Sequence, residues 1–355
     1  MKNYAITGIQ QIGIGVENME EAWRWYRKQF GMDVPIFKDS GIASHMAGYT
    51  GGEGRRRVAV LAMSMHGGGA FEVWQFADRT PAPPAEQIRM GDLGINGVII
   101  KAPVIDSSFN LHRTAGITLT ESPVTGGNGS LCYPVRDLYG NAFIIEEDVD
   151  VFKRTSHPAG GVKGAVIGVT DIEKSLSLYS DVLGYDQVVY DVTGEFADLA
   201  PLHGGKGSFR RIRLKQSEPN TGGFSLLLGT SCIELLQAID FKPRKIFENR
   251  YWGDQGYIHV CLDVHNMGNL KEACEKAGFP FTVDSDDAFD MGDANGRFAY
   301  AEDPDGTLVE LVEAFKVPLV KKLGLYLNMD KRDPGKPIPR WMLKALGFSR
   351  VKDSD

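Results

Sequence analysis

The chain has 355 residues, of which 39 are basic and 46 acidic, giving a formal net charge of −7. This acidic balance argues against a nucleic-acid partner, and no apolar run reaches the length of a membrane span. A hydrophobic content of 43% supports a folded core rather than disorder, and the first residues lack the apolar stretch of a secretory signal. We therefore expect a cytoplasmic protein that acts on a small molecule. The four cysteines form no CxxC pair, so neither a thiolate zinc site nor a disulfide framework is indicated.

An internal repeat organises the chain from its first strand onward. The segments IQQIGIGVENMEEAWRWYRKQFGMDV and KGAVIGVTDIEKSLSLYSDVLGYDQV align without a gap when Val16 is set against Val169. Each copy begins with a short apolar strand and continues with apolar residues at helical spacing. Each helix is then followed by a glycine, Gly31 or Gly184, where a left-handed cap is common. The repeat predicts a strand followed by a helix in both copies.

The segments that follow repeat as well. GRRRVAVLAM matches SFRRIRLKQ, and AFEVWQF matches CIELLQA, each of the latter two carrying one glutamate, Glu72 or Glu234. Both halves then add a strand, a helix ending in Ala-Gly and a closing strand–turn–strand, CYPVRDLYGNAFIIEED or FAYAEDPDGTLVELVEA. The sequence thus predicts an α+β fold of four βαβββ units that form two curved-sheet cups. The expected parts are an N-terminal half (1–150), a linker (151–162), a C-terminal half (163–315) and a C-terminal extension (316–355).

Three further features fall outside this pattern. The extension contains one expected helix near Trp341 to Leu346, and we expect it to pack on the surface or at a subunit contact. Two glycine-rich loops, 66–70 and 202–207, have the composition of a lid, which alone is weak evidence. The histidines other than His259 lie outside the ligand positions, in expected loops or helices, and surface positions are expected for them.

These residues resemble the vicinal oxygen chelate superfamily, which includes glyoxalase I, extradiol dioxygenases, methylmalonyl-CoA epimerase and bleomycin-resistance proteins. The resemblance rests on IGIGVENMEEAWRWYRKQFG, IGVTDIEKSLSLYSDVLG, IELLQ, IHVCLDV and EDPDGTLVELVE, and it extends to about residue 315. It implies that two units curl into a cup that holds a divalent metal ion. The ligands in that family come from the first and fourth strands of each unit.

The resemblance places two candidate ligand positions in each unit. They fall, in chain order, on Gln11 and Glu72, Asn96 and Ile144, Gly164 and Glu234, and His259 and Glu310. Isoleucine and glycine side chains offer no ligand atom, so the second and third units have each lost one. If the first and fourth units pair, four ligands meet in one cup: Gln11, Glu72, His259 and Glu310. If neighbouring units pair, the set is Glu234, His259 and Glu310. We favour the first pairing, whose ligand set is also that of animal-type glyoxalase I.

A mixed carboxylate, amide and imidazole set suits Zn, Ni, Co, Mn or Fe(II), so one divalent metal ion is the expected cofactor. The resemblance implies that the metal binds two adjacent substrate oxygens while Glu310 or Glu72 acts as the general base on a carbon-bound proton. We therefore expect a glyoxalase-like isomerase or lyase acting on a small oxygenated substrate. The glutathione contacts of that family fall on Gly15 and Phe76, which have no polar side chain, so glutathione is not expected.

Three residues are expected to bind the substrate. Trp74 shares a strand face with Glu72, while Arg57 and Arg211 lie on the matching basic strands and suit an anionic group. Two other functions stay open: an Fe(II) extradiol-type ring-cleaving dioxygenase, and a metal-free binding protein of the bleomycin-resistance kind. A single histidine in the ligand set argues against the usual 2-His-1-carboxylate iron site. The sequence is compatible with a monomer or a homodimer.

Overall fold

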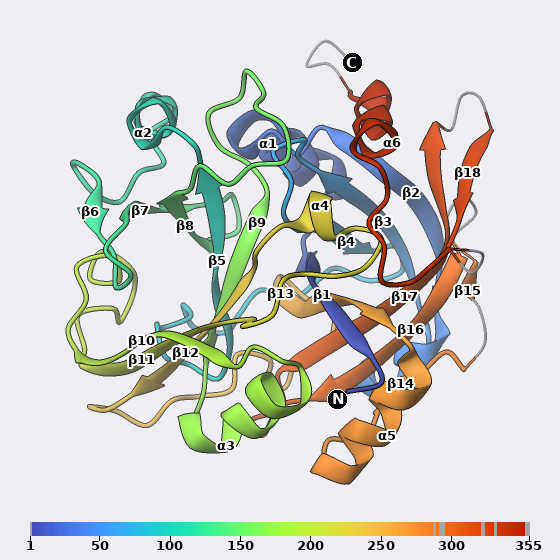
Figure 1. Ribbon diagram of the computed structural model, residues 1–355. Coiled ribbons are helices and arrows are strands. Elements are labelled where there is room, and N and C mark those ends of the chain that lie inside the picture. The colour runs from blue at the N-terminus through green and yellow to red at the C-terminus, as the bar shows by residue number, and fades with distance from the viewer. Residues whose placement is uncertain (1, 287–288, 291–294, 321–323, 330–331, 352–355) are drawn as a thin grey trace.

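Two curved sheets make up the molecule, and the computed structural model describes all but a few short segments of it (Figure 1). The elements follow the predicted order of four βαβββ units, so the α+β fold is confirmed. The description covers the chain except residues 1, 287–288, 291–294, 321–323, 330–331 and 352–355.

The first two units have these bounds: β1 (Ala5–Gly15), α1 (Met19–Phe30), β2 (Val34–Ala43), β3 (Arg55–Met63) and β4 (Ala70–Phe76), then β5 (Gly94–Ala102), α2 (Ile105–Thr114), β6 (Val124–Thr125), β7 (Leu131–Arg136) and β8 (Ala142–Glu147). The third unit has β9 (Val162–Gly168), α3 (Ile172–Leu176), β10 (Gln187–Gly194), β11 (Phe209–Lys215), α4 (Ser225–Leu228) and β12 (Cys232–Ala238). The fourth has β13 (Gly256–His265), α5 (Met267–Ala277), β14 (Val283–Asp284), β15 (Phe289–Asp290), β16 (Asn295–Glu302) and β17 (Leu308–Val320). The extension adds β18 (Leu325–Asn328) and α6 (Arg340–Ala345).

Helix α1 shows how the local sequence determines where a helix begins and ends and which face it buries. The Asn18 side chain caps its N-terminus by accepting a hydrogen bond from the backbone N–H of Glu21, 3.1 Å away. Gly31 ends the helix in the left-handed conformation, with a φ of 57°. Tyr26 and Phe30, four residues apart, bury one face of the helix in the core. The predicted glycine cap at Gly31 and the predicted apolar stripe are both confirmed.

The sheet order pairs the first unit with the fourth. One sheet runs β14-β16-β17-β13-β1-β4-β3-β2, and the other runs β10-β11-β12-β9-β5-β8-β7-β6. In every unit the first strand lies parallel to the last, and antiparallel pairs β1–β13 and β5–β9 join the units within each sheet. The favoured pairing is therefore confirmed, and the pairing of neighbouring first and second, or third and fourth, units is wrong.

Strand β13 buries both of its faces, and this positions the site. Val260 and Leu262 point into the main core, which draws residues from both sheets. Since neighbouring side chains on a strand point to opposite faces, His259 and Cys261 point into the cup of the first and fourth units. Both are fully buried there. We call this the first cup, and the cup of the second and third units the second cup.

The extension packs against the first unit. Helix α6 covers the predicted segment except its last residue, and Leu343 and Leu346 join an apolar cluster with Val34 and Leu61. Strand β18 pairs with β17, so the extension also continues the sheet. No helix in the described part of the chain combines the length and the apolar character needed to cross a bilayer.

Candidate metal centre

The register of three adjacent strands brings the candidate ligands together. Gly13 on β1 pairs with His259 on β13 and also with Glu72 on β4, so these two side chains lie on either side of it. Glu310 is level with Cys261, one position along the same face from His259. A Cβ atom at Gly13 would lie 2.5 Å from the imidazole of His259, well inside van der Waals contact. Glycine at this position therefore leaves the space that the imidazole occupies.

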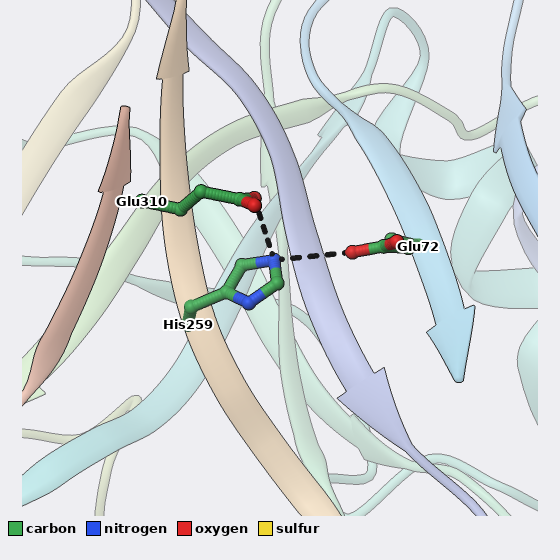
Figure 2. A group of neighbouring side chains, drawn as sticks. All are labelled: Glu72, His259 and Glu310. Carbon is green, nitrogen blue, oxygen red and sulfur yellow. Dashed lines mark ion pairs between the residues drawn. The ribbon is translucent and has the colours of Figure 1, made fainter. Parts of the chain in front are cut away.

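The four expected ligand side chains converge in the first cup. His259 Nε2 lies 3.1 Å from Glu310 Oε2 and 3.4 Å from Glu72 Oε2, and Figure 2 shows it pointing toward both carboxylates. The Gln11 amide nitrogen lies 3.2 Å from Glu310 Oε2 and 3.3 Å from Glu72 Oε2. All four side chains are buried. The ligand atoms of the histidine and the two glutamates lie within 4.8 Å of one another.

The electrostatics of this cluster call for a further positive charge. Burial raises the pKa of Glu310, and the nearby charge of Glu72 raises it further, against the opposing effect of His259. Burial lowers the pKa of the His259 imidazole, but Glu310 and Glu72 outweigh this effect, and its pKa is raised. The buried Nε2 of His259 has no hydrogen bond of acceptable geometry in the described structure, although it faces two carboxylates. An unsatisfied imidazole nitrogen between buried carboxylates fits a divalent cation.

Two aromatic residues that the sequence did not single out complete the surroundings. The Tyr300 hydroxyl donates to Glu310 Oε1 at 2.8 Å and lies 3.3 Å from His259 Nδ1. The Trp252 ring lies parallel to the imidazole, with centroids 6.1 Å apart. Counting outward from the DPDG turn between β16 and β17 would have placed Tyr300 opposite Glu310. Trp252 lies in a loop without periodicity, so no sequence signal marks it.

The cluster opens into a cavity of about 390 Å³. Trp74 and Arg57 both line this cavity, and Arg57 forms an ion pair with Asp39 at 2.9 Å. Much of the remaining wall is apolar and comes from β2, β3, α4, the C-terminal extension and the aromatic residues around the cluster. Representative members are Phe37, Leu61, Met63, Phe224, Trp252, Phe298 and Leu346.

The structure places Arg211 and Glu234 in the second cup, apart from this cavity. Arg211 is fully buried and forms ion pairs with Asp198, at 2.8 Å, and with Glu234. Arg213 pairs with Glu234 and with Glu146, both at 2.7 Å. The chain therefore does not bring Glu234 to His259, and Arg211 is not among the residues that line the cavity. Its guanidinium serves buried carboxylates instead.

Arginine pairing also explains the acidity of Glu234. Burial raises the pKa of this carboxyl, but Arg211 and Arg213 outweigh that effect, and the pKa is lowered to about 2. Glu234 is therefore a stable anion whose charge is already balanced. Around Glu310, by contrast, no arginine among the described residues offsets burial, and the pKa of that carboxyl is raised.

The other ligand positions of the second and third units have structural roles. The Asn96 amide donates to the backbone oxygens of Asp92 and Gly94, at 2.6 and 3.0 Å. A Cβ at Gly164 would lie 2.5 Å from Cys232 Sγ, so the space beside it is filled. Among the described residues the second cup has no cluster of three metal-ligating side chains.

The expectation of surface positions for the other histidines is wrong for two of them. His66 and His112 are 1% and 0% exposed. Burial lowers the pKa of each to about 4, so both rings are neutral at pH 7. Neither belongs to the metal cluster, because His66 contacts Thr155 and His112 contacts Tyr133.

Comparisons with known proteins agree with this architecture. Residues 161–311 match the model of the Glyoxalase/Bleomycin resistance protein/Dioxygenase superfamily. Glyoxalase I from Zea mays superposes with a TM-score of 0.55 and 14% identity, over 88% of this chain and 94% of that one. A putative dioxygenase from Bacillus subtilis gives 0.57 and 13%, over 87% and 86%. A search of curated protein sequences finds no match. Residues 161–311 therefore match this superfamily by sequence, and most of the chain shares its fold with the two solved structures.

Proposed function

We propose that this chain is a divalent-metal-dependent enzyme that removes a carbon-bound proton from a small oxygenated substrate, in a glyoxalase-like isomerase or lyase reaction. One observation carries the proposal: a buried imidazole nitrogen without a hydrogen bond faces two carboxylates beside a cavity. A merely structural cluster would balance these charges internally, as the second cup does. The proposal goes beyond the superfamily, whose members differ in chemistry.

Gln11, Glu72, His259 and Glu310 would hold the metal ion. When bound, the ion would polarise two neighbouring substrate oxygens and lower the barrier to loss of the adjacent proton. The chain's own contribution is to fix the ligands and to accept the proton. Tyr300 holds one oxygen of Glu310 and lies against the imidazole, so it orients two of the ligands.

The hydrogen bonds distinguish the two glutamates. Glu310 receives hydrogen bonds from Tyr300 and Gln11, whereas Glu72 receives one from Gln11 alone among the described residues. Both glutamates line the cavity, and because Glu72 is the less constrained of the two, we assign it the transfer of the proton. Glu310 remains the anchored carboxylate.

The cavity also narrows the class of substrate. Its polar groups include Gln11, Glu72, Glu310 and Arg57, while aromatic and aliphatic side chains form much of the wall. The two positions that contact glutathione in the resembling family are Gly15, packed against the backbone of Asp254, and Phe76, which is buried. These features support a substrate with two adjacent oxygens on an apolar body, rather than a glutathione conjugate.

The test begins with metal analysis of the full chain purified without chelators. We expect about one divalent ion per chain, and loss of the ion in His259→Ala. The matched control is His45→Ala, which removes a histidine from the same cavity but outside the cluster. Absence of metal, both as purified and after reconstitution with Zn, Ni, Co, Mn or Fe(II), would refute the proposal in favour of a metal-free binding protein.

Activity then separates the two kinds of enzyme. The metal-loaded chain should exchange the carbon-bound proton of an apolar α-hydroxyketone for deuterium in D₂O, and Glu72→Gln should abolish the exchange. Oxygen uptake with a catechol, in the absence of such exchange across a panel of hydroxyketones, would support ring cleavage instead. The ligand set expected for that alternative, with Glu234, is not assembled in this fold.

A further inference from the structure

A second hollow of about 730 Å³ lies apart from the metal centre and shares no lining residue with the first cavity. Four separate segments form it: the loop before β5, the end of β7, the turn at 200–207 and the loop after β12. The turn contains one of the two glycine-rich loops. We call this hollow the cationic groove and define it by Gln87, Arg89, Arg136, His203, Lys206, Asp240 and Phe241.

Three cations, Arg89, Arg136 and Lys206, line the cationic groove. Arg89, Arg136 and Lys206 form no ion pair within the described ranges of the chain. This is unusual in a chain with a net charge of −7, in which many arginines are paired. The groove contains one acidic residue, Asp240, whose carboxylate accepts a hydrogen bond from the backbone N–H of Ser208 at 2.7 Å. The groove therefore carries a net positive charge.

Local packing holds these cations in place. Gly204 has a φ of +72°, and a Cβ there would lie 2.9 Å from Cβ of Arg89. Both the left-handed backbone conformation and this close contact favour glycine. The backbone N–H of Met90 donates to the carbonyl of His203 at 2.8 Å, which fixes the turn to the loop that carries Arg89. The Arg89 guanidinium lies 3.9 Å above the ring of Phe241. A site that binds anions needs fixed donors of this kind.

Arg136 is oriented separately. The Gln87 amide oxygen, in the orientation that satisfies both side chains, accepts from Nη1 and Nη2 of Arg136 at 3.3 Å. This neutral partner holds the guanidinium without cancelling its charge. Two guanidinium groups and an ammonium group, each oriented or exposed in one groove, match the oxygens of a phosphate group.

Comparison of the repeated units shows that, among the described residues, the unpaired positive charge is specific to the glycine-rich turn of the third unit. The first unit has GGEG where the third has GGKG, so Glu53 occupies the position of Lys206. Glu53 forms an ion pair with Arg55 at 3.4 Å, whereas Lys206 has no such pair among the described residues. The same glycine turn thus carries an internally balanced charge in one unit and an unbalanced cation in the other.

We propose that the cationic groove binds a small phosphorylated molecule through Arg89, Arg136 and Lys206. The site is separate from the metal centre and does not depend on the proposed reaction. Gly204 and Gly207 line the groove and have no side chain to cover the backbone of the turn, so the ligand can approach it closely.

The experiment uses inorganic pyrophosphate as the probe and the metal-free full chain, so that chelation in the first cup plays no part. Calorimetric titration should show one binding site per chain. Lys206→Glu introduces the residue that the first unit carries, and we expect it to weaken binding at least tenfold; Arg136→Gln should weaken it by a similar factor. Lys153→Glu makes the same charge change at an exposed position outside the groove and should leave the affinity within about twofold.

Several results would overturn the proposal. These are an absence of binding, an equal loss in Lys153→Glu, or a loss in Glu72→Gln, which would place the anion in the first cup. Tight binding of a mixed-sequence oligonucleotide that pyrophosphate cannot displace would instead indicate a nucleic-acid surface. Circular dichroism of each variant checks that the fold is retained.

Discussion

The first and second cups place side chains at corresponding strand positions but balance their charge in opposite ways. In the first cup, Glu72 and Glu310 face a histidine and a cavity, and no lysine or arginine in the described structure pairs with them. In the second cup, Glu234 lies between two buried arginines. The residues 196–202 help to fill its interior, with Phe196, Leu199 and Leu202 in an apolar cluster.

The difference separates carboxylates that are paired within the fold from carboxylates that remain open to an external cation. A buried carboxylate with a fixed cationic partner strengthens the native state only while both partners remain. A buried carboxylate without one is costly to the fold and available to an external cation. The chain therefore uses one glutamate position for structure, and we propose that the matching one serves a metal site. Four predictions test this contrast, beginning with the largest effect.

Replacement of Glu234 should have the largest effect, on stability. Glu234→Gln leaves Arg211 and Arg213 with one balancing charge fewer in a fully buried site, and we expect a loss of about 3–5 kcal/mol in the free energy of unfolding. Chemical denaturation measures this change. Metal content should stay at the wild-type level, and loss of metal with retained stability would reverse the roles of the cups.

Lowering the pH should remove the stabilising contribution of the Glu234 carboxylate. The pKa of Glu234 is about 2 in the folded chain, below its ordinary value of 4.5, so its stabilising contribution is complete above pH 4.5 and is lost as the pH falls through about 2. The stability difference between wild type and Glu234→Gln should therefore shrink steadily from pH 5 to pH 2.5 in urea denaturation. A difference that stays constant over this range would contradict the assignment.

Gly13→Ala should impair the first cup alone. The added Cβ would lie 2.5 Å from the His259 imidazole, and we expect a loss of roughly 1–3 kcal/mol in stability from overpacking. Displacement of the imidazole should also weaken metal affinity by about tenfold, the scale seen when ligand orientation is disturbed. Gly268→Ala, on α5, is the matched control, because its Cβ would meet only Asn266 Oδ1, at an ordinary contact distance of 4.0 Å. Unchanged metal affinity in Gly13→Ala would remove His259 from the ligand set.

Glu310→Gln should have the smallest effect on stability, and one of opposite sign to Glu234→Gln. The pKa of Glu310 is raised by burial, so its charged form destabilises the metal-free chain at a pH above the ordinary value of 4.5. Removing that charge should stabilise the metal-free chain by about 1 kcal/mol at pH 7 while weakening metal binding. Thermal unfolding with and without chelator measures both. A metal-free variant that melts below wild type would contradict the contrast.

Much of the fold and of the candidate site could be predicted from the sequence, because both depend on repeated local patterns. The apolar spacing in α1, the glycine cap at Gly31 and the matching glutamates predicted four units, and the family resemblance then implied the candidate ligand positions. The pairing of units rested on a chemical argument, that Gly164 cannot bind a metal, and the strand order confirms it.

What the sequence could not show depends on contacts between distant segments. Arg211 was expected to bind substrate, because a basic residue on a strand looks the same whether its partner is a ligand or Glu234. The ring of Trp252 reaches His259 from a loop whose path has no periodic signal. The orientation of Arg89 over Phe241 likewise follows from tertiary packing alone.

The pairing of β1 with β13 also fixes the order in which the two cups can form during synthesis. Every strand of the second cup has been made once Ala238 is added, whereas β1 waits for residues 256–265 before its second edge is covered. At a synthesis rate of roughly 5–20 residues per second, the time between the synthesis of β1 and that of β13 is on the order of 10–50 s. The cup rich in ion pairs can therefore form first and hold the chain while the earliest strand remains half paired. The candidate metal centre is completed only when the last unit leaves the ribosome.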